Sequence, residues 1–122
     1  CRAAGISIRH NFTESLQHRY WVHHTAGFLK DQGFNTAIEH KVDGNGFIDI
    51  LAEKDNQKTA VEIETGKSDI AQNISKIQHA DFFEILLVAT SPEAVSACRK
   101  AVSQFSADSK IPIRILTWLD IA

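Results

Sequence analysis

Three short strand-like runs that follow one another almost without interruption constrain the fold more than any other feature of this sequence. The runs cover residues 36–42, 47–53 and 59–64, and strong turn signals separate them, namely Asp43-Gly44-Asn45-Gly46 and Asp55-Asn56-Gln57. Because connections this short join antiparallel neighbours, we expect the three strands to form a meander.

Helical patterns and two further strands surround the expected meander. A helix is predicted over 13–32, with Thr13 as its N-cap and Gly33 as its stop. After the meander we expect a helix over 69–79 capped by Ser68, a strand over 82–90, a helix from Pro92 to about residue 105 and a strand over 112–118. The run Ile85-Leu86-Leu87-Val88 is typical of a strand buried on both faces. The order αβββαβαβ predicts an α/β fold with a mixed central sheet and helices on both faces.

Length and composition indicate one globular domain with one core. The chain has 122 residues, of which 43% are hydrophobic and 23% charged. We expect residues 1–12 to be an arm or linker remnant and 13–122 to be the domain. Since the sequence begins with Cys1 rather than Met, we expect the domain to have been excised from a larger protein.

Charge, cysteine content and hydropathy exclude several functional classes. The net charge of −2 gives no large positive field of the kind that indicates a nucleic-acid partner. A protein that binds phosphates through metal ions does not need such a field. Cys1 and Cys98 form no CxxC pair, so neither a thiolate zinc site nor a disulfide framework is expected, and a cytoplasmic location fits. No apolar run approaches the ~20 residues of a membrane span. There is no Gly-rich phosphate loop and no nucleophile elbow.

Asp49 lies in the middle of the second strand-like run. Since side chains alternate along a strand, Asp49 should share a face with Phe47 and Leu51, and Ile48 and Ile50 should share the other face. A carboxylate in such apolar surroundings needs a donor, a cation or a metal. The alternative is an Asp that caps a turn or pairs with a Lys.

The third run carries two carboxylates on one face, Glu62 and Glu64. Two like charges this close repel unless a cation lies beside them. They could form a solvated edge with Lys58 and Lys67. However, Asp49 on the paired strand could complete a group of three hard oxygen donors, which favours Mg²⁺ or Mn²⁺ as a cofactor.

An Asp on the second strand, a Glu-x-charged triplet on the third and the order αβββαβ together resemble the PD-(D/E)XK, or restriction-endonuclease-like, nuclease superfamily. The resemblance covers residues 13–90. It implies that Asp49 and Glu62 bind the metal, that the carbonyl of Ile63 is a further ligand, and that Glu64 occupies the family's Lys position. A Glu there is similar to a variant among restriction enzymes, in which the carboxylate is a general base or an added metal ligand.

The segments 61–68 and 72–76 also resemble nuclease-type domains that are attached to larger DNA-processing ATPases and mobile-element proteins. This narrower resemblance implies DNA as the substrate and an ATPase or another DNA-processing domain in the same protein. Nucleases of this type often pair two domains to cut two strands, so a homodimer is a further expectation.

Several polar residues could replace the missing Lys or hold the substrate. Lys67 follows Gly66, and a helix would bring Gln72 and Lys76 to one face with Asn73 beside them. The alternative is an ordinary solvated helix face. His18, at roughly helical spacing from Val22, Ala26 and Leu29, either contacts a phosphate or is a hydrogen-bonded boundary His. Tyr20 and Trp21 either stack on bases, if exposed, or belong to the core.

These observations support three hypotheses. The leading one is a metal-dependent DNA endonuclease with Asp49, Glu62, Glu64 and Lys67 as catalytic residues. The second is a nuclease-like domain that has lost catalysis and binds DNA or a partner subunit. The third is a structural α/β domain with an incidental acidic face.

Overall fold

The computed structural model describes residues 4–42, 46–66, 69–78, 80–105 and 109–122, and for residues 4–15 it describes the backbone alone. The elements are α1 (Ala4–Asp31), β1 (Asn35–Val42), β2 (Gly46–Lys54), β3 (Gln57–Glu64), α2 (Ile70–Gln78), β4 (Glu84–Ala89), α3 (Pro92–Phe105) and β5 (Ile113–Thr117). This order confirms the predicted αβββαβαβ succession, and the chain is a mixed α/β domain.

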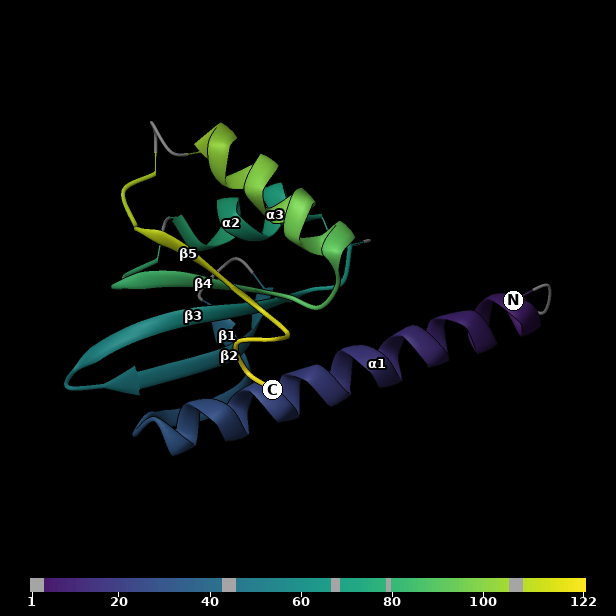
Figure 1. Cartoon of the computed structure of the whole chain (residues 1–122), viewed down its shortest axis with the longest axis horizontal. Coiled ribbons are helices and arrows are strands. Elements are labelled where there is room, and N and C mark those ends of the chain that lie inside the picture. Colours follow the sequence, from purple (N-terminus) through teal and green to yellow (C-terminus); the bar gives the residue numbers. More distant parts are fainter. Residues whose placement is uncertain (1–3, 43–45, 67–68, 79, 106–108) are drawn as a thin grey trace.

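The five strands form one sheet in the order β1-β2-β3-β4-β5. β1, β2 and β3 pair antiparallel, as expected for a meander, whereas β3, β4 and β5 pair parallel. The parallel pairs arise because α2 and α3 each carry the chain back to the starting end of the sheet. Figure 1 shows α1 against one face of the sheet and α2 with α3 against the other.

Two apolar cores result, one on each face. β4 contributes to both, because Leu86 and Val88 face the α1 side while Ile85 and Leu87 face the α2 and α3 side. All four side chains are buried, which confirms the prediction of a strand covered on both faces. The α1 side also holds Val22, Ala26 and Leu29, and the other side holds Ile70, Ile74, Ile77, Ala94, Cys98 and Ala101.

The helix α1 begins at Ala4, nine residues before the predicted start at Thr13, so most of the segment expected to be an arm or linker is helical. Its projection past the sheet is visible in Figure 1. Its end agrees with the sequence: Gly33 has φ of 96°, and Phe34 N donates to Leu29 O over 3.0 Å. No helix in the described part of the chain is both long enough and apolar enough to span a membrane.

Turns and caps mostly follow the predicted chemistry. Asp55 and Asn56 both have positive φ, 54° and 65°, which is the tight hairpin geometry that joins β2 to β3. The turn expected at 43–46 lies largely outside the described residues. At α2 the backbone N of Gln72 donates to Asp69 Oδ1 over 3.1 Å, so Asp69 caps this helix, whereas the predicted cap, Ser68, lies outside the described residues.

Candidate functional site

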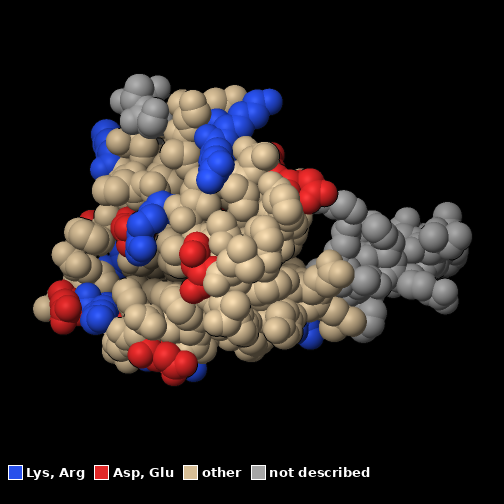
Figure 2. All heavy atoms as spheres, in the orientation of Figure 1, with Lys and Arg blue, Asp and Glu red and all other residues tan. Residues whose placement is uncertain are grey.

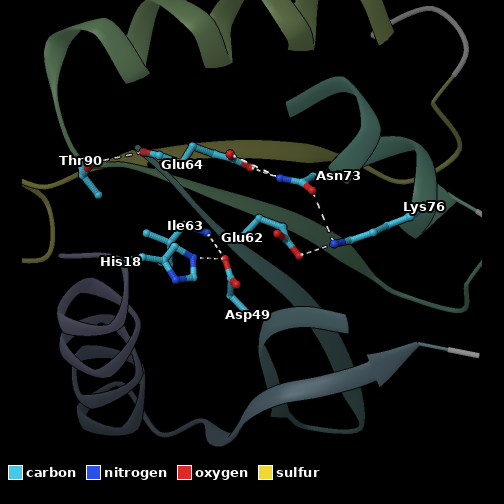
Figure 3. A network of polar contacts seen from close by, with 8 residues as sticks. All are labelled: His18, Asp49, Glu62, Ile63, Glu64, Asn73, Lys76 and Thr90. Atoms are coloured by element: carbon cyan, nitrogen blue, oxygen red, sulfur yellow. Dashed lines mark hydrogen bonds and ion pairs between the residues drawn. The ribbon is translucent and has the colours of Figure 1, made fainter. Parts of the chain in front are cut away.

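The site forms where β2 separates from β3. The two strands pair from Lys54↔Gln57 as far as Ile50↔Val61, and the next residue of β2 is Asp49. There the carboxylate of Asp49 replaces a backbone partner, because Ile63 N donates to Asp49 Oδ2 over 2.8 Å. Polar side chains from β2, β3, α1 and α2 lie close to this separation (Figure 3).

The side chains of β2 do not alternate strictly between the two faces of the sheet around Asp49. The predicted faces were therefore wrong there. Ile48 packs in the core beneath α2, while Ile50 packs in the core beneath α1, although alternation would place both on one face. On the neighbouring strand Glu39 has φ of 55°, which is outside the β region and twists β1 beside Asp49. The distorted backbone lets Asp49 reach toward α1, where His18 Nε2 donates to its Oδ2 over 3.2 Å.

The pair of His18 and Asp49 is half-buried, with 40% and 19% of the two side chains exposed. The hydrogen bond to Asp49 raises the pKa of His18 above its usual 6.5, against the opposing effect of burial. His18 is therefore a boundary residue with a defined partner. It also lies in the candidate site, and its contact with a phosphate stays a prediction.

Glu62 is the second carboxylate of the site, and only 3% of it is exposed. It points toward α2, where Lys76 Nζ lies 3.7 Å from its Oε2. That separation is too long for a hydrogen bond, and Oε2 has no hydrogen-bond partner among the described residues. Burial, followed by repulsion from Asp49, raises the pKa of Glu62 to about 8 despite the opposing effect of Lys76.

Glu64 faces α2 as well, but it has different partners. It is fully buried, and Asn73 Nδ2 donates to its two carboxylate oxygens over 3.2 and 3.5 Å. The Oδ1 of the same Asn73 accepts a hydrogen bond from Lys76 Nζ over 3.5 Å. Thr90, which follows β4, donates from its backbone N and its Oγ1 to the carbonyl of Glu64 over 3.1 and 3.3 Å.

The structure joins most of the predicted site residues in one network from α1, β2, β3 and α2 (Figure 3). Gln72 is exposed on α2, and the described contacts of this network do not include its side chain. Lys67 lies outside the described residues. The members of the network are His18, Asp49, Glu62, Ile63, Glu64, Asn73, Lys76 and Thr90.

Two features of the site differ from expectation. Within the described residues, no group of three or more His, Cys, Asp or Glu side chains could hold a metal ion, so Asp49, Glu62 and Glu64 do not form the expected group of three. Glu64 binds Asn73 instead. Thr90 was missed altogether, although its place directly after a parallel strand next to β3 was a usable signal.

Comparison with known proteins shows the fold alone. No protein-family model matches the chain, and no curated protein matches it. A solved structure described as a protein of unknown function, AF1548, matches 81% of this chain with a TM-score of 0.59 and 20% sequence identity. The match spans 57% of the length of that chain, so the chain is similar in fold to part of a longer protein.

Proposed function

We propose that this chain is a metal-dependent DNA nuclease domain of the restriction-endonuclease-like kind. The observation that carries the proposal is the pair of acids at the separation of β2 and β3, in which Glu62 is buried beside a second carboxylate and its Oε2 has no hydrogen-bond partner among the described residues. The order αβββαβ and the mixed five-stranded sheet support the same proposal.

A hard divalent cation fits the donors of this site. Two carboxylates, Asp49 and Glu62, and the backbone carbonyl of Ile63 are the kind of oxygen ligands that Mg²⁺ and Mn²⁺ prefer. A buried carboxylate with a pKa near 8, whose Oε2 has no hydrogen-bond partner among the described residues, is costly to ionise, and a cation held by Glu62 and Asp49 would offset that cost. When bound, the ion would polarise the scissile phosphate and make a water molecule acidic.

Other residues of the site would position the metal ligands and bind the phosphate. The N–H of Ile63 and the ring of His18 fix the Asp49 carboxylate, as outer partners of metal ligands commonly do. Lys76 supplies a positive charge within 3.7 Å of Glu62 and would hold a phosphate oxygen as negative charge develops in the reaction. It therefore replaces the Lys that the superfamily carries at the position of Glu64.

We infer a positioning role for Glu64 rather than the role of general base or metal ligand. Its carboxylate is held by Asn73, and Asn73 in turn accepts a hydrogen bond from Lys76. Glu64 thus orients the amide of Asn73, and this amide in turn orients the ammonium of Lys76. Its complete burial keeps its carboxylate away from solvent and substrate.

A second candidate function is a nuclease-like domain that binds DNA or a partner subunit without cutting. One observation favours it, namely that Lys76 already supplies a cation to Glu62, which lowers the need for a metal there. No third carboxylate or histidine of the described residues completes a metal-binding group, and this also favours it.

A cleavage assay separates the two functions. We would incubate the protein with single-stranded, duplex, flap and junction DNA in Mg²⁺ or Mn²⁺, together with Asp49→Ala, Glu62→Gln and, as a control on the exposed face of α3, Lys100→Ala. Nuclease function predicts cleavage by the wild type and the control and its loss in both acid variants. Cleavage that survives the acid substitutions would refute the site, and DNA binding without cleavage in either metal would support the second candidate.

A further inference from the structure

A hollow of about 490 Å³ lies beside the candidate site and is not used by the proposed chemistry. The α1 side of its wall consists of Leu16, Gln17, Tyr20 and Trp21, and the remaining residues are Thr65, Thr90 and Ser91. Its volume falls within the range of about 300–1,000 Å³ that is common for small-ligand sites.

The hollow lies where ligands collect in α/β folds. Thr65 directly follows β3, and Thr90 and Ser91 directly follow β4, which is parallel to β3. The space outside the carboxyl ends of parallel strands is the usual ligand crevice of such sheets. Thr90 also ties the hollow to the candidate site, because its backbone N and Oγ1 bind the carbonyl of Glu64.

An exposed aromatic ring borders this hollow. Tyr20 is 59% exposed, so much of its ring is accessible to a ligand in the hollow. His24 lies nearly parallel to it, with an interplanar angle of 13° and 5.7 Å between the centroids, and Trp21 contacts it edge to face at 5.2 Å. These neighbours hold the ring in place while much of its surface stays accessible.

Polar groups on the rest of the wall complement a flat heterocycle. The Gln17 amide is exposed and offers both donors and an acceptor. The Ser91 hydroxyl accepts a hydrogen bond from Ala94 N over 3.1 Å, and its own proton can still be donated. An apolar body beside amide and hydroxyl groups is suited to a nucleobase, which combines a stacking face with a polar edge.

We propose that this hollow binds an unpaired base of single-stranded DNA, with the base stacked on Tyr20. A base inside a duplex has both faces covered by its neighbours, so the ring of Tyr20 can stack only on a base that has left the helix or lacks a partner strand. The inference rests on the proposed DNA substrate and names its class: a substrate with a single-stranded portion at the scissile phosphate.

The distribution of charged side chains agrees with recognition of a single base rather than of a long stretch of DNA backbone. On the one face that Figure 2 draws, Lys and Arg side chains are interspersed with Asp and Glu side chains over the coloured part, without a continuous basic patch. Duplex binders that track the backbone generally rely on such a patch. Stacking supplies affinity that depends less on charge.

The test is a binding measurement in EDTA, which keeps it independent of cleavage. Fluorescence of Trp21, isolated by Trp118→Phe, is followed while a single-stranded oligonucleotide or a hairpin duplex of the same length is added. We expect saturable quenching by the single strand and weaker binding of the duplex. Tyr20→Ala should reduce affinity for the single strand about fivefold or more, as loss of one stacked base does.

Two controls distinguish stacking from a general effect of the substitution. Tyr20→Phe keeps the ring and should retain the affinity. Phe83→Ala removes an aromatic side chain that is 53% exposed before the opposite end of β4, and it should change nothing. Equal binding of duplex and single strand, absence of binding, or unchanged affinity in Tyr20→Ala would each overturn the inference. Loss of cleavage with retained single-strand binding would instead overturn only the proposed nuclease chemistry.

Discussion

Glu62→Gln should change the pH dependence of stability in metal-free protein. The side chain of Glu62 is almost fully buried, and its pKa rises from 4.5 to about 8 in the folded chain. The folded state therefore favours the protonated acid, whereas the unfolded chain releases its proton near pH 4.5. The resulting stability is fully present below pH 4.5 and is lost as the pH rises toward about 8.

The magnitude of this loss follows from the two pKa values. A rise from 4.5 to about 8 corresponds to roughly 5 kcal/mol of unfolding free energy, taken as an order of magnitude. Gln has nearly the same shape and cannot ionise, so Glu62→Gln should unfold with a much flatter pH profile between pH 5 and pH 8. At pH 8 in EDTA the variant should be more stable than the wild type.

Urea denaturation measures this directly. Unfolding would be followed by tryptophan fluorescence in EDTA at intervals from pH 5 to pH 8.5, for the wild type, Glu62→Gln and Glu53→Gln. The last is a control on the same sheet, outside the network (Figure 3). If Glu62→Gln retained the slope of the wild type, the buried acid would not be the titrating group and the reasoning would fail.

Three further predictions concern Lys76, His18 and the core. Lys76→Ala should lower DNA cleavage and steepen the loss of stability at high pH, because the cation 3.7 Å from Glu62 is removed; Lys100→Ala should change neither property. In an NMR titration the pKa of His18 should exceed 6.5 and should fall in Asp49→Asn, and the associated stability is present at low pH and lost as the pH rises through that raised value. A His18 titration that is unchanged in Asp49→Asn would contradict the pairing. Ile74→Ala, which opens a cavity beneath α2, should cost about 2–5 kcal/mol in chemical denaturation, and a cost below 1 kcal/mol would contradict the close packing there.

The element order was readable from the sequence because each element carries a local signal. Turn residues at 43–46 and 55–57 separate the meander strands. The apolar run of β4 places apolar side chains on both faces of the sheet. The start of α1 was not readable. Gly5 and the β-branched Ile6 and Ile8 have low helix propensity, so the pattern argued against the helix that the structure has from Ala4.

The candidate site was predictable only where side chains alternate regularly between the two faces of the sheet. Alternation correctly placed Glu62 and Glu64 on one face, and both meet side chains of α2. It failed at Asp49, because the separation from β3 and the left-handed Glu39 redirect that side chain toward α1. Whether three carboxylates meet in one site depends on such tertiary distortions.

Mn²⁺ binding shows whether Asp49 and Glu62 share a divalent cation. Free Mn²⁺ would be measured by electron paramagnetic resonance while the ion is added to the wild type, Asp49→Ala, Glu62→Gln and Lys100→Ala at pH 7.5. We expect one saturable site in the wild type and in Lys100→Ala, and its loss in both acid variants. Equal Mn²⁺ binding by all four proteins, or by none of them, would contradict it.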